Sequence, residues 1–392
     1  SSTFRNNTAY YPEVRPTDQN GNEQWWNPMG SAVSVWGNAT VTIVDCLIEN
    51  NHTLSDIDEG MYVLGAISIN SDAPHDADEK WIPIIARNVI RYNRITSYDN
   101  ARGGGIYSQR PMKVINNLVS NNVLRTTSTG GSVIQGAGIW IQNSSMWNHE
   151  TQTNFGLNSY FINNTITNNE QYFSDGLLHG VGAGIYFENQ TIDSETIFFN
   201  NIVWGNQAWT RPNFGNSDHH GDFYKRIRVE HNNIQNFSET VVYNALSENL
   251  DIDPAFTDSA NGNFLLSDAS QLIGVGGTEF EGYSAPTVDL LGNTRPSPAG
   301  SKPDIGAYEN SLSESPYPSQ VKNLTASVSS GAVDLSWDLN EETDIEGYKI
   351  YMSQTSGFVP SDLDIVGTTT DGYYSVTGLT NRETYYFRVA AV

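Results

Sequence analysis

A short sequence pattern recurs along the first two thirds of the chain and constrains its fold more than any other feature. Its clearest copy is 182–206, where a glycine-rich approach leads into a short apolar strand. A second strand follows and ends in Asn-Asn, an alternating apolar pair and a final Asn. Related copies occupy 136–169 and 103–122, with weaker ones at 65–93 and 30–51. Recurring short strands of this kind indicate stacked units that bury one continuous core.

Two columns of asparagine mark the successive units. The last Asn of each unit falls at Asn7, Asn51, Asn93, Asn122, Asn169 and Asn206. The Asn that opens the strand falls at Asn88, Asn117, Asn164, Asn201 and Asn233, with Cys46 in that column one turn earlier. We predict that the amides of each column bond to the turns above and below, which satisfies buried polar groups along the stack.

This pattern of NN and GGIY-type stretches resembles the right-handed parallel β-helix, the fold of pectate lyases and of many bacterial surface proteins. The resemblance covers about residues 1–275 and implies an all-β solenoid. It says little about function, because lyases, hydrolases, adhesins and phage spikes share this fold.

The glycine-led strands carry a candidate binding face. With Val33, Ile67, Ile106, Ile139 and Ile185 set inward, the next residue of each strand points outward. We therefore predict an exposed aromatic ladder of Tyr107, Trp140 and Tyr186, with Gln109, Gln142 and Glu188 beside it. Aromatic faces next to amide and carboxylate groups suit sugar rings, so these six residues are the predicted ligand-binding group. The alternative is that the rings are covered by loops or only favour strands.

The connecting loops carry a second candidate group. Asp175 and His179 belong to one turn, and Asp218, His219 and His220 belong to the next. Such side chains could ligate a metal or supply a catalytic acid and base, although they could equally be solvated. The lyase resemblance implies a Lys or Arg base, with Ca²⁺ or another charge that neutralises the uronate carboxylate. No basic residue here lies in a motif that identifies such a base, so no catalytic residue is carried over.

After Asn233 the pattern changes. Asp253–Phe256 (DPAF), Gly292–Arg295 (GNTR) and Asp304–Glu309 (DIGAYE) resemble the closing segment of certain bacterial surface β-helix proteins. We predict a first domain over 1–310, with its cap at about 250–310 covering the open strand edges. Within the cap, Asp258, Asn261 and Asn263 have calcium-ligand chemistry without the full spacing, and a plain Asx turn is the alternative.

A different pattern follows a polar, proline-containing linker at 311–320. From Val321 the stretches NLTASVSSGAVDLSWDL, EGYKIYMS and YYSVTGLTNRETYYFRVAAV resemble a fibronectin type III domain. Trp337 occupies the position of that family's core tryptophan, and Leu379 with Tyr385 matches its tyrosine corner. The resemblance implies a β-sandwich over 321–392 that stops before its final strand, and we expect the chain to be a piece of a longer polypeptide.

The charge limits the possible partners. The formal net charge is −24, from 20 basic and 44 acidic residues, which argues against nucleic acid and anionic membranes as partners. One cysteine excludes an internal disulfide, and no apolar run is long enough to insert into a membrane.

These features predict a non-enzymatic structural or adhesive segment of a secreted bacterial cell-surface protein. Its expected partners are a polysaccharide or cell-surface glycan and other domains or subunits of a surface assembly. Calcium is the one cofactor that the sequence suggests. Two alternatives stay open. One is a polysaccharide lyase or glycoside hydrolase that acts in the β-helix groove, and the other is a fibre or stalk component that binds partner subunits.

Overall fold

The computed structural model of the chain describes residues 2–11, 30–35, 40–55, 62–70, 79–128, 133–142, 146–148, 153–173, 176–177, 180–188, 194–209, 212–216, 227–237, 244–245, 248–340 and 345–392. The chain divides into two compact units, Ser1–Glu314 and Ser315–Val392, and the division falls inside the segment predicted as a linker. Strands dominate both units. Among the residues described, the short 3₁₀ helices are η1 (Glu79–Trp81), η4 (Ser259–Asn261) and η5 (Asp362–Asp364). Within the described ranges, no helix is long and apolar enough to cross a membrane.

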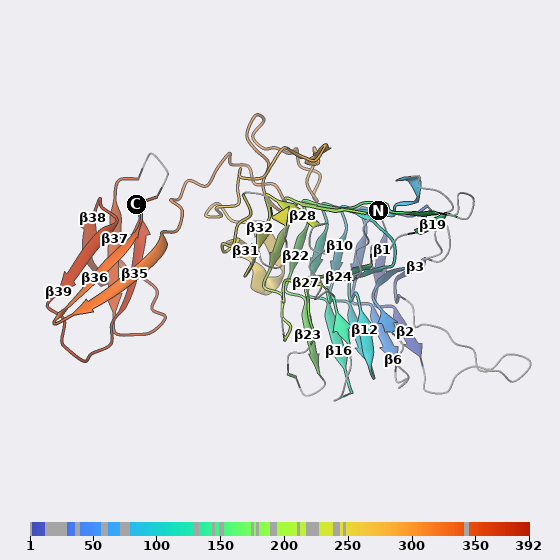
Figure 1. Ribbon diagram of the computed structural model, residues 1–392, viewed down its shortest axis with the longest axis horizontal. Coiled ribbons are helices and arrows are strands. Elements are labelled where there is room, and N and C mark those ends of the chain that lie inside the picture. The colour runs from blue at the N-terminus through green and yellow to red at the C-terminus, as the bar shows by residue number, and fades with distance from the viewer. Residues whose placement is uncertain are drawn as a thin grey trace, which may run out of the picture. The chain divides into compact units, whose positions relative to one another are not determined.

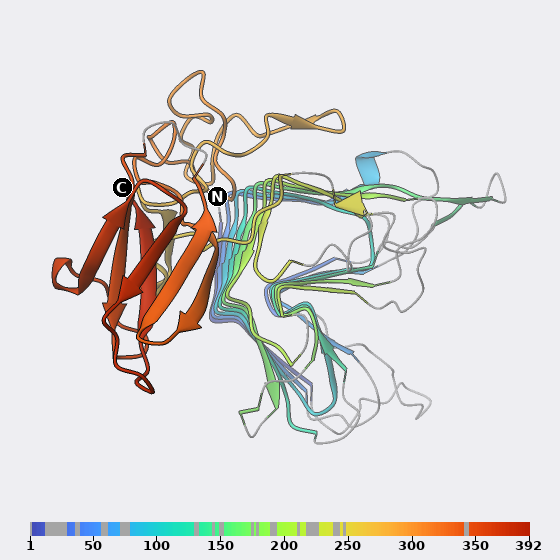
Figure 2. The same ribbon diagram turned by 60° about the vertical axis from the view of Figure 1, so that its left-hand side comes forward.

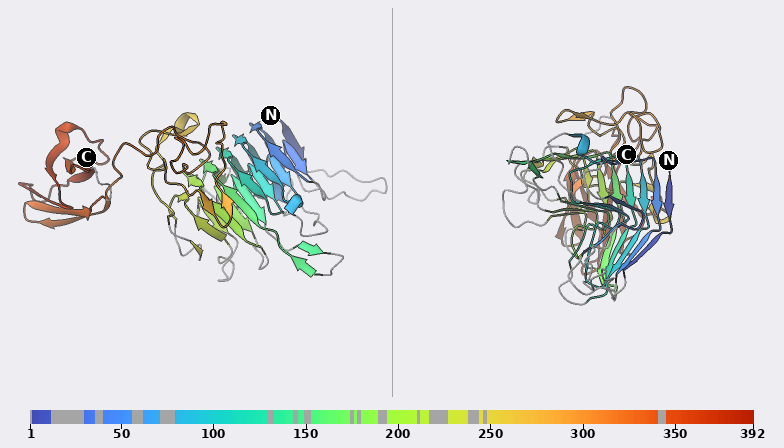
Figure 3. Two further views of the ribbon diagram at one scale, coloured as in Figure 1. Left: turned by 90° about the horizontal axis from the view of Figure 1, so that it is seen from above. Right: turned by 90° about the vertical axis from the view of Figure 1, so that its right-hand side faces the viewer.

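The first unit is a solenoid whose turns contribute strands to five parallel sheets (Figures 1 and 3). We name them sheets A to E, in the order in which the chain visits them within a turn. Sheet A holds β1 (Thr3–Arg5), β5 (Leu47–Glu49), β10 (Val89–Arg91), β15 (Leu118–Ser120), β22 (Thr165–Thr167), β26 (Ile202–Trp204) and β29 (Asn233–Ile234). Sheet B holds β2 (Thr8–Tyr11), β6 (His52–Ser55), β11 (Arg94–Ser97), β16 (Val123–Thr126) and β23 (Glu170–Phe173).

The chain then folds back through three further sheets. Sheet C holds β7 (Tyr62–Leu64), β12 (Asn100–Arg102) and β17 (Ile134–Gln135). Sheet D holds β3 (Val33–Val35), β8 (Ile67–Ile69), β13 (Ile106–Ser108), β18 (Ile139–Gln142), β24 (Ile185–Glu188) and β27 (Phe214–Asn216). Sheet E holds β4 (Thr42–Val44), β9 (Ile84–Ala86), β14 (Lys113–Ile115), β21 (Ser159–Ile162), β25 (Thr196–Phe199), β28 (Ile227–Glu230) and β30 (Asn244–Ala245).

The first unit also contains short antiparallel hairpins outside the five parallel sheets. They are β19 (Met146–Asn148) with β20 (Thr153–Phe155), β31 (Phe256–Asp258) with β32 (Asn263–Leu266), and β33 (Glu279–Phe280) with β34 (Tyr283–Ser284). The predicted all-β architecture, with long parallel sheets in its N-terminal part, is therefore confirmed.

Two asparagine ladders run along the solenoid, as predicted. The first joins Asn88, Asn117, Asn164, Asn201, Asn232 and Asn249. The second joins Asn7, Asn51, Asn93, Asn122, Asn169, Asn206 and Asn213. In each step one Oδ1 accepts from both nitrogens of the previous member, as Asn164 does from the backbone N–H and the Nδ2 of Asn117, at 2.9 and 3.0 Å. The amides thereby lock each turn to the next, except in the last step of the second ladder, where Asn206 and Asn213 belong to the same turn.

One member of the first ladder differs from the prediction. Asn232 occupies the position assigned to Asn233, which instead pairs with Ile202 inside sheet A. The residue before each ladder asparagine explains why the prediction was wrong by one position. Except at Pro212, before Asn213, it makes the corner with a positive φ, between 51° and 73°, and is most often Asn, which tolerates this conformation better than other non-glycine residues. In that turn the corner residue is His231, so the Asn-Asn pair begins one position late.

Two separate cores fill the solenoid, and Figure 2 shows the turn folded into two arms. The main core lies between sheets A, D and E and includes the ring cluster Phe161, Phe187 and Phe198. The second core lies between sheets B and C and holds smaller side chains, among them Ala101 and Leu124. Sheets B and C are therefore a packed arm of the solenoid and not simple connecting loops.

The segment predicted as a cap lies along the flank of the solenoid. Only its beginning follows the last turn, where Leu250 bridges to Asn233. Beyond that it bonds to the corner asparagines of three successive turns: Asn200 with Gly277, Asn163 with Asp304 and Gly306, and Asn116 with Val288 and Arg295. We call residues 274–310 the brace, because they tie neighbouring turns together from outside.

A buried ion pair holds the brace. Arg295 Nε lies 2.7 Å from Glu309 Oε2, and neither side chain is exposed. The other guanidinium nitrogens of Arg295 donate to Asn116 Oδ1 at 2.8 Å and to the Gly306 carbonyl at 3.0 Å. The two motifs that the sequence singled out in this segment, GNTR and DIGAYE, thus meet in one cluster. A buried charge of this kind is tolerated only with such complete pairing.

The second unit is a sandwich of two antiparallel sheets. One holds β35 (Lys322–Ser329), β36 (Ala332–Asp338) and β39 (Tyr373–Thr377), and the other holds β38 (Ile365–Thr369), β37 (Tyr348–Ser353) and β40 (Tyr386–Ala391). Trp337 packs in its core against Tyr348, as the sequence predicts. The predicted tyrosine corner is present as well, because the Thr380 N–H donates to the Tyr385 hydroxyl at 3.2 Å.

Candidate functional site

Sheet D has the register that the sequence predicts. Its inward column is Ile67, Ile106, Ile139 and Ile185. The residue after each isoleucine lies on the opposite face, where Tyr107 pairs with Trp140 and Trp140 pairs with Tyr186. The three rings therefore form a column along the solenoid axis.

Glycines let sheet C turn directly into sheet D. Gly103 has a φ of +63°, and a side chain there would meet the Ile106 carbonyl oxygen at 2.4 Å. A Cβ on Gly138 would lie 2.4 Å from the Gly184 carbonyl oxygen of the next turn. Only glycine fits such close backbone approaches. The recurring glycine-rich stretch thus forms the tight turn that brings sheets C and D face to face.

The prediction that the aromatic column is exposed is wrong. Trp140 is fully buried, and Tyr107 and Tyr186 are 3% and 2% exposed. The reason is the arm formed by sheets B and C, because the outer face of sheet C packs over these rings. Leu64 and Val181 complete the cluster with the three rings. We call the space between sheets C and D the inner corner.

Polar side chains of sheet C hold the central ring in the inner corner. Tyr107 and Trp140 are stacked at 4.6 Å between centroids and 7° between planes. The Arg102 guanidinium lies 4.6 Å from the Trp140 ring, a cation–π contact. Gln135 Oε1 accepts from Trp140 Nε1 at 3.3 Å and from Arg102 Nε at 3.1 Å. The column therefore stabilises the fold, which was the alternative left open by the sequence.

Glu188 is the ionisable group of the inner corner with a shifted pKa. Its side chain is 14% exposed, and its Oε2 lies 3.7 Å from Arg102 Nη2. Burial raises the pKa of Glu188, and the charge of Arg102 opposes that rise only in part. A carboxyl group with a raised pKa beside aromatic rings can act as a general acid.

The predicted amides border the same place. Gln142 is in register with Glu188, and both Gln142 and Gln109 are half-buried. Sequence reasoning missed Arg102 and Gln135 as members of this group, since both lie in a segment that it read as a connecting loop. A ligand-binding role for the inner corner remains a prediction.

The acid and histidine candidates of the loops lie outside the described residues. These are Asp175, His179, Asp218, His219 and His220. Their predicted convergence therefore remains a prediction. In the part of the chain that the structure describes, no group of three His, Cys, Asp or Glu side chains could hold a metal ion.

The predicted calcium residues form a local turn. Asp258 caps η4, its Oδ1 accepting from the Asn261 N–H at 3.3 Å and its Oδ2 from Asn261 Nδ2 at 2.8 Å. Asn263 Oδ1 accepts from the Leu265 N–H at 3.2 Å. These oxygens are engaged in the Asx-turn pattern that the sequence gave as the alternative to a calcium loop.

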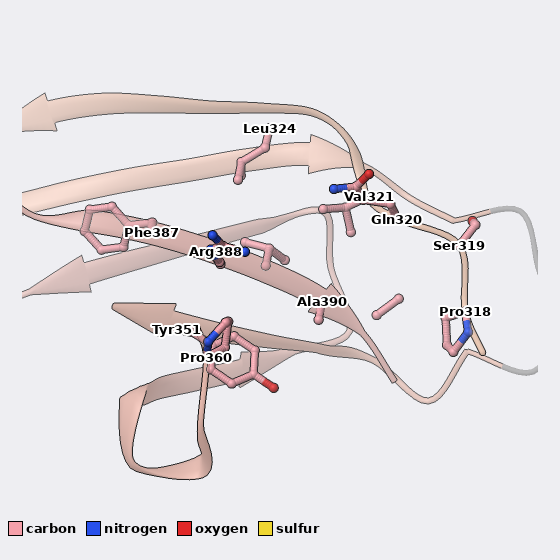
Figure 4. Close-up of a pocket in the computed structure, with 12 residues that line it drawn as sticks. Pro318, Ser319, Gln320, Val321, Leu324, Tyr351, Pro360, Phe387, Arg388 and Ala390 are labelled. Atoms are coloured by element: carbon pink, nitrogen blue, oxygen red, sulfur yellow. The ribbon is translucent and has the colours of Figure 1, made fainter. Parts of the chain in front are cut away.

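The second unit has a hollow of about 510 Å³ at one edge of its sandwich (Figure 4). Residues from the start of β35 and from β37 and β40 line it, including Val321, Leu324, Tyr351 and Phe387. Its charged lining residue, Arg388, packs over Phe358 at 5.6 Å. This lining is largely apolar and lacks paired acidic and basic groups, so we assign no reaction to it.

Comparison with known protein families identifies residues 319–392 as a fibronectin type III domain. This match confirms the resemblance seen in the strands, the core tryptophan and the tyrosine corner of the second unit. No curated protein matches the chain.

Proposed function

We propose that this chain is a structural and adhesive segment of a large extracellular bacterial surface protein. The observation that carries the proposal is the continuous bonding of the solenoid. One asparagine ladder runs from Asn7 to Asn213 and the other from Asn88 to Asn249, and the brace ties three turns together from outside. Because each turn is bonded to its neighbours, such a stack resists bending and suits a rigid extended segment of a surface protein.

The fibronectin type III domain supports the same function. This domain is consistent with a structural or adhesive module, and here it follows a solenoid in the same chain. The acidic surface keeps such a segment soluble and disfavours its association with anionic membranes. A solenoid also repeats its outward side chains at every turn, which suits the recognition of a repeating polymer such as a glycan.

A glycan array and a product assay on the intact chain test this function together. We expect binding to at least one glycan without any change in its chain length or its reducing ends. Turnover of any bound polysaccharide, with a rate proportional to the protein concentration, would refute the non-enzymatic assignment.

A second candidate function is a polysaccharide lyase or glycoside hydrolase, and Glu188 is the observation that favours it. Its carboxyl group has a raised pKa and lies beside the stacked rings of the inner corner. If the chain is such an enzyme, Glu188→Gln abolishes turnover and leaves the thermal unfolding temperature unchanged. Glu279→Gln, at an exposed position on the outer hairpin, is the matched control. Equal activity of both variants and the unchanged protein would exclude Glu188 as the acid.

A further inference from the structure

The outer face of sheet B carries a row of side chains at one position of successive turns. Arg125 pairs with Tyr172 in neighbouring strands. Glu170 bridges to Gln207, and the Gln171 N–H donates to the Gln207 carbonyl at 2.9 Å. Trp209 lies two residues after Gln207, as Tyr172 lies two residues after Glu170. Counting on from this bridge places Trp209 beside Tyr172, so that Arg125, Tyr172 and Trp209 follow one another along the solenoid axis.

This row faces away from the protein interior. Leu124, Gln171 and Ala208 alternate with it along the chain and are buried between sheets B and C. Arg125 and Tyr172 are half-buried, whereas 71% of Trp209 is exposed. The Trp140 ring of the inner corner is fully buried by contrast. Figure 1 shows β16 and β23, which are neighbours in this sheet, side by side.

Polar side chains that donate or accept hydrogen bonds share the outer face of sheet B with the rings. The side chains of Arg94 and Arg125 can donate hydrogen bonds, that of Glu170 can accept them, and that of Gln207 can do both. Two arginines and one glutamate are nearly balanced, although acidic residues outnumber basic ones by more than two to one in the whole chain. Donors and acceptors placed beside exposed aromatic faces are the groups that recognise the hydroxyls and CH faces of sugars.

We infer that the outer face of sheet B, which we call the sheet B platform, binds an uncharged polysaccharide lying along the solenoid axis. Sugar rings would pack on Trp209 and Tyr172, while Arg125, Glu170 and Gln207 bond to ring hydroxyls. Parallel strands repeat at about 4.8 Å, a length close to that of one sugar ring in an extended chain. The inference rests on the proposed adhesive function and names the class of ligand and the face that binds it.

The charge of the protein decides between occupants. With a net charge of −24, the chain repels a polyanion such as a uronate polymer or a nucleic acid. A second copy of the chain is repelled for the same reason. An uncharged polysaccharide meets no such barrier, and its regular repeat matches the regular repeat of the platform.

Native affinity electrophoresis of the full chain tests the platform. The gels contain hydroxyethyl cellulose, glucomannan or dextran, and a parallel gel contains carboxymethyl cellulose as an anionic polymer with the same backbone as the first. We expect retardation by at least one uncharged polymer and none by carboxymethyl cellulose. Loss of one stacking contact in Trp209→Ala should weaken binding about tenfold or more, by analogy with base stacking on aromatic side chains.

Three variants make the result decisive. Trp209→Phe keeps an aromatic face and should retain most of the binding, and Tyr172→Ala should lose binding as Trp209→Ala does. Leu291→Ala, which removes a 63% exposed apolar side chain from the brace, should bind normally. Because Trp209 is exposed, its replacement should leave the unfolding temperature unchanged.

Each contrary outcome has one meaning. Unchanged binding of Trp209→Ala, with loss of binding in Gln142→Ala, overturns the platform and leaves the adhesive function in place at the inner corner. Stronger retardation by carboxymethyl cellulose overturns the assignment of an uncharged ligand. Failure of every polymer to bind overturns the platform, and an empty glycan array would also overturn the proposed function.

Discussion

Replacing Arg295 by methionine should detach the brace from the solenoid. The side chain forms a 2.7 Å ion pair with Glu309 and two further bonds, to Asn116 and Gly306, in a fully buried place. Methionine fills a similar volume but leaves the Glu309 carboxylate buried without its counter-charge. Removing one partner of a buried pair costs about 3–5 kcal/mol, so we expect a loss of that size in the stability of the first unit.

The exposed pair of Arg87 and Asp45 is the matched control. Arg87 binds Asp45 through two nitrogens at 2.7 and 2.9 Å, but about a third to a half of each side chain is exposed. Exposed pairs contribute about 1 kcal/mol or less, so Arg87→Met should be nearly neutral. The same substitution at the two arginines then compares a buried pair with its additional hydrogen bonds to an exposed pair. Arg295→Met/Glu309→Gln should recover part of the loss, because it removes the stranded charge.

Urea unfolding and hydrogen exchange are the assays. The chain has two compact units, so its unfolding is not treated as one transition, and the transition of the second unit serves as an internal reference. Exchange should accelerate at the brace amides that bond to the solenoid, such as Gly277 and Gly306. A loss below about 1 kcal/mol in Arg295→Met, or exchange that accelerates equally in both units, would refute the reasoning.

Four further predictions follow from the same contacts. Asn164→Ala should lower the free energy of unfolding of the first unit by about 3 kcal/mol, because it leaves buried groups on both neighbouring turns without hydrogen-bond partners. Asn121→Gly, at a corner with a φ of 54°, should leave that free energy nearly unchanged in the same urea titration. Trp140→Ala should lower the stability of the first unit by about 3–5 kcal/mol, and a neutral result would mean that the ring is not packed as described. Burial and the Glu309 charge raise the pKa of Asp304 to about 7 from 3.8, so its contribution to stability should be complete below pH 3.8 and be lost as the pH rises through about 7. Asp304→Asn should remove this slope from a pH series of unfolding curves. Tyr385→Phe should cost the second unit about 1 kcal/mol through the lost bond to Thr380 and leave the first unit unchanged.

The features that could be predicted from the sequence are those that each turn repeats. The first Asn of each pair makes a corner with a positive φ and the second bonds to the next turn, so one dipeptide encodes both the bend and the stacking. Alternation then fixes the register of sheet D, because a shift by one residue would turn every isoleucine outward. Where the corner residue is His231, the pair no longer marks the corner, and the prediction slipped by one residue.

The arm of sheets B and C could not be predicted, and the error in the candidate site follows from it. Its strands are only two to four residues long and include polar sequences such as His52–Ser55 and Asn100–Arg102. The strands of sheets A, D and E are equally short, but a polar strand has no apolar alternation that would distinguish it from a loop. Without the arm, nothing in the sequence shows that Tyr107, Trp140 and Tyr186 are covered.

The two faces with aromatic residues differ in what covers them, and that difference assigns their roles. On sheet D, Arg102 and Gln135 of the same arm meet Trp140 and bury it, so its area is already used to stabilise the fold. On sheet B, the exposed Trp209 ring has area still available to a ligand. An aromatic column in a solenoid sequence therefore predicts packing as readily as binding. The strand that precedes the aromatic column in the same turn decides between packing and binding, because that strand either covers the rings or leaves them exposed to solvent.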